Sequence, residues 1–304
     1  ARDTRTSGAM LADAAASGLA SVGRDPVRLG RLPTPGVAGY CAAESVPALV
    51  VTASHNPPSD NGLKLLGPDG VELTVAELER VEARLDAADD AAWDAVGTPV
   101  RVADATERYV ADLLAAADRD RIAAADLTVA LDPGHGAGAL TSPALFRRLG
   151  TDVVTVNAQP DGHFPGRDPE PVAEGLGDLR RLVRAADADL GVAHDGDADR
   201  AVFVDERGRS IPGDASLAAL AAATVGPDDA VVAAVNASQR LVDVVRDAGA
   251  RLELTPIGAT HLVGRIRALR EAGVPVPVAG EGNGGVFFPD HRLVRDGAYA
   301  AVRL

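Results

Sequence analysis

The sequence is poor in several residue types, and each shortage narrows what the protein can be. Its 304 residues contain one cysteine, Cys41, which excludes an intrachain disulfide and fits a reducing cytoplasm. We expect no signal peptide, and no apolar run reaches the ~18 residues that a membrane span needs. Aromatic residues make up 3% of the chain, so Ala, Val and Leu must supply most of the core. We therefore expect a cytoplasmic protein with no membrane partner.

Positive charge is also scarce. The formal net charge of −14 argues against nucleic acid or an anionic membrane surface as a partner. Lys64 is the only lysine in the chain. It falls ten positions after Ser54, and this placement makes it a candidate functional residue.

Strand-like and helix-like segments alternate along most of the chain. We predict strands over 27–32, 48–53, 127–131, 152–156, 190–193, 201–204, 230–235, 251–254 and 276–279, and helices over 7–22, 106–117, 176–186, 215–223, 240–248 and 258–272. A capping box at Thr74 and Glu77 starts a further helix, residues 33–36 are expected to form a loop, and 86–98 a loop or a solvated helix end. The alternation predicts an α/β fold with three successive similar α/β domains and mixed, largely parallel sheets. We place the domains at residues 1–121, 122–212 and 213–304.

The stretch from Val51 to Lys64 presents a serine at the end of a strand. Ser54 and His55 follow the apolar run, and Pro57 and Pro58 then stiffen the loop. A serine beside a histidine at this position indicates a reactive group. For this stretch taken alone, an ordinary polar turn is an equal alternative.

The most specific pattern is acidic. Asp195, Asp197 and Asp199 follow an apolar strand at alternate positions, so a continued strand would point all three carboxylates to one side. Three like charges so close repel one another unless a cation lies among them. Oxygen ligands favour Mg²⁺, Mn²⁺ or Ca²⁺ over zinc. Arg200, next in the chain, favours a phosphate partner.

Two alternatives exist for this acidic loop. An EF-hand also has Asp at positions one, three and five, with Glu206 here at position twelve. However, Arg200 takes the position where that loop needs glycine, and the flanking segments are strand-like rather than helical. A solvated acidic turn without a metal is the other alternative.

Two glycine-rich segments follow strands. Gly280 to Gly285 carries Glu281 and Asn283, whose carboxylate and amide suit vicinal sugar hydroxyls, although a flexible turn explains the same pattern. Asp132 to Gly138 links a strand to a helix as phosphate-binding turns do. It lacks the Walker lysine and the Rossmann glycine spacing, so we favour a tight structural turn.

Taken together, these motifs resemble the α-D-phosphohexomutase superfamily. The sequences that match its motifs are Thr52–Pro57 for the phosphoserine loop, Asp195–Arg200 for the metal loop, Glu281–Gly285 for the sugar-binding loop, Arg2–Gly8 for a stretch early in the first domain, and Asn61–Lys64 for the active-site lysine segment. The sugar loop has the Glu-x-Asn-Gly-Gly form associated with archaeal members, which leans toward phosphomannomutase or phosphoglucosamine mutase.

The resemblance implies a mechanism. A phosphoryl group on Ser54 passes to a hexose monophosphate, a sugar 1,6-bisphosphate forms, and its other phosphate returns to the serine. The resemblance implies one Mg²⁺ per chain, held by Ser54, Asp195, Asp197 and Asp199. Arg200 and Lys64 balance phosphate charge, Lys64 with a lowered pKa transfers a proton, and His55 orients Ser54. The substrate-binding residues it implies are Glu281, Asn283, Gly284, Thr260, His261 and Arg5.

The chain departs from the family pattern in three places. The family's first strand is expected before Ala1, and its fourth, phosphate-binding domain is expected after Leu304, so both ends look cut. The segment 256–261 lacks the usual form of the third-domain specificity loop. We expect hexose phosphates as partners and a monomer or homodimer. The alternatives are a metal-dependent sugar phosphatase and a silent, truncated paralogue that acts as a binding module.

Overall fold

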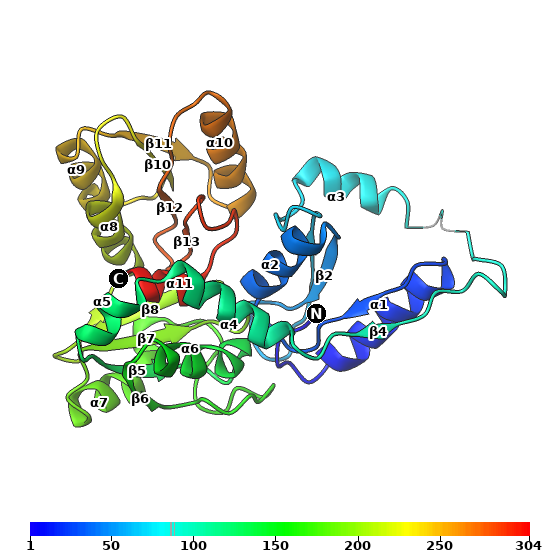
Figure 1. Cartoon of the computed structure of the whole chain (residues 1–304), viewed down its shortest axis with the longest axis horizontal. Helices are drawn as coiled ribbons and strands as arrows, with labels where there is room; N and C mark the ends of the chain where they lie inside the picture. Colours follow the sequence, from blue (N-terminus) through cyan, green and yellow to red (C-terminus); the bar gives the residue numbers. More distant parts are fainter. Residues whose placement is uncertain (86, 88) are drawn as a thin grey trace.

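The computed structural model describes residues 1–85, 87 and 89–304, which form three successive α/β units (Figure 1). The first contains α1 (Gly8–Ser21), β1 (Val27–Arg28), α2 (Thr34–Glu44), β2 (Ala48–Val51), β3 (Leu63–Leu66), α3 (Val75–Glu82) and β4 (Val100–Arg101). The second contains α4 (Ala105–Ala116), α5 (Arg119–Ala124), β5 (Thr128–Asp132), η1 (Ala137–Leu140), α6 (Ser142–Arg148), β6 (Asp152–Thr155), η2 (Ala173–Leu176), α7 (Gly177–Ala185), β7 (Leu190–His194), β8 (Ala201–Asp205) and β9 (Ser210–Ile211). The third contains α8 (Gly213–Thr224), β10 (Ala230–Ala234), α9 (Gln239–Asp247), β11 (Arg251–Thr255), α10 (Ala259–Glu271), β12 (Val278–Gly280), β13 (Val286–Phe287) and α11 (Gly297–Arg303).

The first unit has two small strand pairs. β2 pairs with β3 antiparallel, and β1 pairs with β4 in parallel, so this unit is less parallel than the sequence predicted. The strands expected over 27–32 and 48–53 end early, at Arg28 and Val51. The β2–β3 register sets Lys64 opposite Val50, beside the strand that leads to Ser54. Figure 1 shows α1 and β4 extending away from the other two units.

Helix α2 corrects the prediction of a loop over 33–36. The helix starts at Thr34 and has proline in its first turn. Proline is tolerated there because the first amide of a helix has no intrahelical acceptor. Its dense proline and glycine content therefore marks a helix start rather than an extended loop.

Helix α3 begins as the capping box predicted. The Thr74 Oγ1 accepts the amide of Glu77, and the Glu77 carboxylate accepts the amide of Thr74. The prediction for 86–98 falls partly outside the described residues, and its described part has no helix or strand.

The second unit is built on a five-stranded mixed sheet in the order β6-β5-β7-β8-β9. β5 is parallel to β6 and β7, whereas β7–β8 and β8–β9 are antiparallel. Alternate residues face opposite layers: Ala130 packs with α7, and Val129 and Leu131 join the core cluster that includes α4 and α6. The result is an α/β/α sandwich with the acidic loop at the end of β7.

The third unit repeats this plan. Its sheet has the order β11-β10-β12-β13, with the final pair antiparallel. Val232 packs in a cluster with α10, and Val231 and Ala233 pack in the cluster shared with α8 and α9. The sugar-loop sequence follows β12, so in all three units a motif starts where a strand ends.

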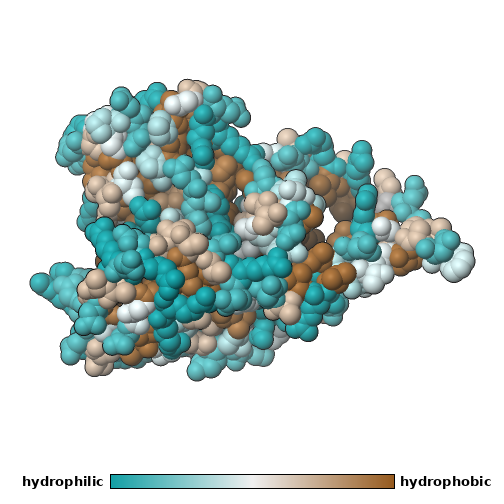
Figure 2. Space-filling view, in the orientation of Figure 1, coloured by the Kyte–Doolittle hydropathy of each residue, from teal (hydrophilic) through white to brown (hydrophobic). Residues whose placement is uncertain are grey.

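The three units share one apolar core. A single cluster of buried side chains contains Leu32, Tyr109, Leu131, Leu217 and Tyr299, which come from all three units. Buried apolar positions are mainly Ala, Val and Leu, as the low aromatic content required. Figure 2 shows apolar residues also reaching the surface in places among hydrophilic ones. Among the described residues, no helix has both the length and the apolar character to cross a membrane.

Candidate active site

Ser54 lies in a sharp turn just after β2. Its φ of +49° is in the left-handed region, and its amide donates to Thr52 Oγ1 at 2.9 Å. The Ser54 hydroxyl donates to Asp195 Oδ2 at 2.7 Å, although 141 residues separate the two in the chain. His55 Nδ1 lies 3.5 Å from the same hydroxyl oxygen. Burial, and next the charge of Arg200, lower the pKa of His55.

Arg5 holds the serine loop in shape. The side chain is fully buried, and its Nε donates to Asp3 Oδ2 at 3.0 Å. Its four remaining N–H groups donate to the carbonyl oxygens of Ser54, Asn56, Pro57 and Asp60. All five donors of the guanidinium are thus engaged within the protein. This geometry is against the expectation that Arg5 binds substrate and gives it a structural role instead.

The acidic loop brings three buried carboxylates together. Asp195, Asp197 and Asp199 each offer an oxygen within 4.8 Å of the others, and all three residues are 0% exposed. The strand argument for this convergence is wrong, because the loop is a turn in which Ala198 has a φ of +56°. The turn, rather than a continued strand, aims the side chains at one point.

The charges of this cluster fit a cation. Among the described residues, Asp197 Oδ1 and Asp199 Oδ1 are buried without a hydrogen-bond partner. Burial, and next the charges of Asp199 and Asp197, raise the pKa of Asp195 well above its usual range. A hard divalent cation would satisfy the free oxygens and remove this repulsion, so the donor set suits Mg²⁺. Asp195, Asp197 and Asp199 could hold such a cation, and the Ser54 hydroxyl lies within hydrogen-bond distance of Asp195.

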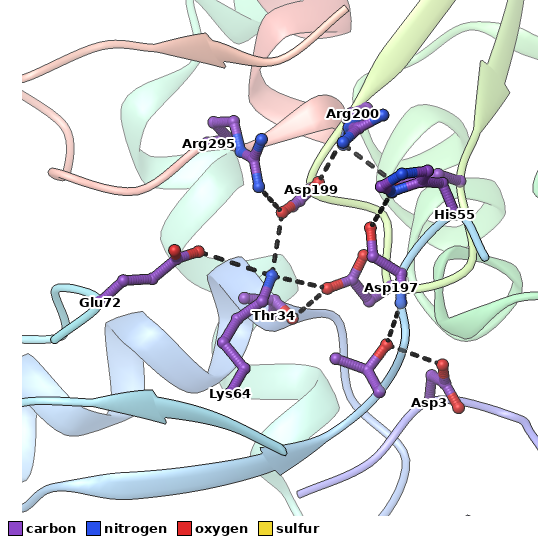
Figure 3. Close-up of polar contacts among 12 residues, drawn as sticks. Asp3, Thr34, His55, Lys64, Glu72, Asp197, Asp199, Arg200 and Arg295 are labelled. Atoms are coloured by element: carbon purple, nitrogen blue, oxygen red, sulfur yellow. Dashed lines mark hydrogen bonds and ion pairs between the residues drawn. The ribbon is translucent and has the colours of Figure 1, made fainter. Parts of the chain in front are cut away.

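Lys64 reaches this cluster from β3 (Figure 3). Its Nζ donates to Asp197 Oδ2 and Asp199 Oδ2, both at 3.1 Å, and lies 3.5 Å from Glu72 Oε1. Burial alone would lower the pKa of Lys64, but these carboxylates raise it above its ordinary value. This direction is opposite to the expected lowering of the pKa, because carboxylates rather than Arg200 lie closest to the Lys64 Nζ.

Two further residues, Thr34 and Arg295, contact the carboxylates of the acidic loop. Thr34 Oγ1 donates to Asp197 Oδ2 at 2.6 Å, and the Thr34 amide donates to the Asp197 carbonyl. Arg295 approaches Asp199 from the opposite side to Lys64, with 2.7 Å between its Nη2 and Asp199 Oδ2 (Figure 3). Although burial opposes ionisation, Arg295 and next Lys64 lower the pKa of Asp199. Neither residue was predicted from the sequence, because neither lies in a recognisable motif.

Arg200 lies at the base of the same loop. It is 7% exposed, and its Nη1 lies 3.5 Å from Glu170 Oε1. Its amide donates to Asp195 Oδ1 at 3.1 Å, and its carbonyl accepts from His194 Nδ1 at 3.0 Å. The backbone of Arg200 therefore shapes the loop, while its side chain lies beside His55 (Figure 3).

The predicted sugar residues divide into buried and exposed ones. Glu281 is 5% exposed, and its carboxylate accepts from Arg295 Nη1 at 3.1 Å and from the Gly258 amide at 3.2 Å. Asn283 is exposed, and Gly284, with a φ of +91°, accepts the amide of Ala201 through its carbonyl. Thr260, half-buried, and His261, exposed, lie in the first turn of α10, next to Gly258. Glu281 is thus tied to the segment carrying the other two.

The Asp132–Gly138 turn is filled by protein atoms. A Cβ on Gly134 would lie 2.5 Å from Arg167, and one on Gly136 would lie 2.6 Å from the carbonyl of Gly196. The Ala137 amide also donates to the Gly196 carbonyl at 2.9 Å. This packing supports the preference for a structural turn, which here braces the acidic loop.

A buried serine that donates a hydrogen bond to one of three converging carboxylates has the features expected of phosphoryl-transfer chemistry. Comparison with protein-family models points to the same class of protein. Models of phosphoglucomutase/phosphomannomutase α/β/α domains I, II and III match residues 1–92, 107–208 and 212–304. The chain belongs to this family, the α-D-phosphohexomutases.

Individual relatives agree with this assignment. A Thermococcus kodakarensis "Phosphoglucomutase/phosphomannomutase" is 42% identical over 100% of this chain and 66% of its own length. A Saccharopolyspora erythraea "Phosphoglucosamine mutase" is 38% identical over 100% of this chain and 67% of its own length. A Burkholderia thailandensis family structure matches 99% of this chain and 66% of its own, with 31% identity and a TM-score of 0.84. The chain thus spans about two thirds of the length of such relatives.

Proposed function

We propose that the protein is a phosphohexomutase that interconverts hexose 1-phosphate and hexose 6-phosphate through a phosphoserine at Ser54. The observation that carries the proposal is the 2.7 Å hydrogen bond from the Ser54 hydroxyl to Asp195, one of three converging carboxylates. A serine that only capped a turn would not need a partner in another unit of the fold. The names of the relatives support the same reaction class.

The residues around Ser54 have separate roles in the phosphoryl transfer. The bond from phosphorus to Ser54 Oγ breaks as a bond from phosphorus to a sugar oxygen forms. The sugar hydroxyl loses one proton and the released Ser54 oxygen gains one, so Ser54 ends as a hydroxyl. The return transfer reverses these changes with the other phosphate of the sugar bisphosphate. When bound, Mg²⁺ supplies neutralisation of charge on the phosphoryl oxygens. Lys64 and Arg200 add positive charge, and His55 orients the hydroxyl. Glu281 is placed to accept hydrogen bonds from sugar hydroxyls, with Asn283 exposed in the same loop.

The substrate follows from the sugar loop. We propose mannose or glucosamine phosphates, because the Glu281–Gly285 loop has the Asn-containing form and the relatives include a phosphoglucomutase/phosphomannomutase and phosphoglucosamine mutases. The domain boundaries near residues 121 and 212, a cytoplasmic location, and a monomer or homodimer without nucleic-acid or membrane partners remain predictions.

The test combines covalent state and turnover. Mass spectrometry of the purified protein should show phosphate on Ser54, and the protein should equilibrate mannose or glucosamine 1- and 6-phosphates when Mg²⁺ and sugar bisphosphate are present. Ser54→Ala should abolish both. Ser59→Ala is the control, since Ser59 lies in the same loop but its hydroxyl donates to Asp60 on the surface. Equilibration by Ser54→Ala would refute the mechanism, and release of inorganic phosphate alone would indicate a phosphatase.

A further inference from the structure

Arg295 joins the acidic loop to the sugar loop through one side chain. Its Nη2 donates to Asp199 Oδ2 at 2.7 Å, and its Nη1 donates to Glu281 Oε2 at 3.1 Å. Asp199 is 0%, Glu281 5% and Arg295 8% exposed, so both contacts are shielded from water. A guanidinium has two terminal nitrogens in a fixed plane, so it can hold two carboxylates at a fixed separation.

The surroundings hold Arg295 in this position. A Cβ on Gly285 would lie 2.6 Å from Arg295 Cδ, so the sugar-loop backbone packs directly against the side chain. The next residue, Asp296, accepts a hydrogen bond from the Tyr109 hydroxyl at 2.8 Å, and the Gly297 amide donates to the Ala198 carbonyl at 3.3 Å. The segment that carries Arg295 is therefore anchored on the second unit as well as on its own.

We propose that Arg295 is a positioning residue that couples the metal ligand Asp199 to the sugar-binding Glu281, an inference that rests on the proposed function of these two loops. Arg295 shares one positive charge between two carboxylates. When the negative charge of Glu281 is removed, the Arg295 guanidinium interacts with Asp199 alone. It then competes more strongly with a cation for the Asp199 carboxylate. The charge on Glu281 therefore affects how strongly Asp199 binds a cation, although Glu281 is not in the carboxylate cluster.

A double-mutant cycle on metal affinity tests the coupling. The probe is Mn²⁺, titrated by electron paramagnetic resonance into dephosphorylated protein without sugar. Glu281→Gln should weaken Mn²⁺ binding about threefold or more, within the range for residues in one network. In an Arg295→Met background the same change should alter binding by about 1.5-fold or less, because the shared cation is gone.

Two further variants separate coupling from a loss of packing. Arg292→Met is the matched control: Arg292 lies three residues earlier and donates to the Pro35 carbonyl at 2.6 Å, which bridges two units without touching Asp199 or Glu281. It should lower the melting temperature yet keep the full effect of Glu281→Gln. Arg295→Lys keeps the charge but not the two-nitrogen fork, so it should give an effect between those in the wild-type and Arg295→Met backgrounds.

The outcomes separate this inference from the proposed function. If the wild type binds Mn²⁺ and turns over hexose phosphates but the fold-changes of Glu281→Gln and Arg295→Met simply multiply, the coupling is refuted and the function stands. The same holds if Arg292→Met removes the effect as fully as Arg295→Met. If the wild type binds no Mn²⁺, both the metal centre and the coupling are refuted.

Discussion

A Cβ atom on Gly196 would lie 2.5 Å from the carbonyl oxygen of Ser54. The backbones of the serine loop and the acidic loop are thus in direct contact. The 2.7 Å hydrogen bond from the Ser54 hydroxyl to Asp195 Oδ2 depends on this contact. Gly196 does not have a left-handed φ, so its own backbone conformation does not require glycine. Glycine is required at this position because a side chain would clash with the serine loop.

Replacing Gly196 should therefore damage catalysis more than it damages folding. In Gly196→Ala the two loops must separate, and a displacement of about 1 Å at a reacting group can cost about 100-fold in rate. We expect kcat to fall by about that factor, measured with saturating hexose phosphate.

Gly264→Ala is the control for this substitution. A Cβ at Gly264, in the middle of α10, meets no atom within 4 Å, so alanine should stabilise the helix by about 1 kcal/mol and leave kcat unchanged. A Gly196→Ala variant with a wild-type kcat would show that the close approach of the loops is not needed.

Two substitutions of Lys64 distinguish a role of its positive charge from a role in proton transfer. Because three carboxylates raise its pKa, we expect its positive charge to matter most. Lys64→Arg keeps that charge and should retain kcat within about tenfold, whereas Lys64→Met should lose about 100-fold or more, as when one stabilising donor is removed. If the arginine variant is as inactive as the methionine variant while both still bind Mn²⁺, proton transfer is the essential role.

Cys41 should make stability fall at alkaline pH. The residue is 0% exposed, and burial raises the pKa of its thiol from 9.0 to about 11. Between these values the thiol ionises in the unfolded chain but not in the folded one. Its contribution to stability is therefore complete below pH 9 and is lost as the pH rises through about 11, a loss of about 2 to 3 kcal/mol.

Urea unfolding at pH 8, 9, 10 and 11 measures this loss. Tyr109 also has a raised pKa, through burial and next the charge of Asp296, so the wild-type slope has more than one source. Cys41→Ala isolates the share of the thiol, and its stability should decline less steeply over the same range. Parallel curves for the two proteins would contradict the assignment.

The sequence predicted the motif loops but not how they meet. Ser54, Asp195, Asp199 and Glu281 were predicted because each lies in a local pattern: a strand end, alternating carboxylates or a glycine-rich turn. Lys64 was predicted because it is the only lysine and falls ten positions after Ser54. Residue type and spacing along the chain are enough to define such patterns.

The partners of these residues were not predictable in the same way. Thr34 and Arg295 reach the acidic loop only after units distant in sequence have docked, and no local pattern marks them. Arg5 shows the reverse problem. It lies in a recognised motif, yet its surroundings engage all five of its donors, and this could be learned only from the folded arrangement.

The contacts around Asp197 and Asp199 also bear on how such a chain can change over evolutionary time. Thr34 and Lys64 come from the first unit, the two aspartates from the second, and Arg295 from the third. A unit exchanged with that of a distant relative would bring its own side chains to these junctions. The units are therefore expected to be inherited together, and a chimera should be active only when the side chains facing these two aspartates are carried across with the unit that contains them.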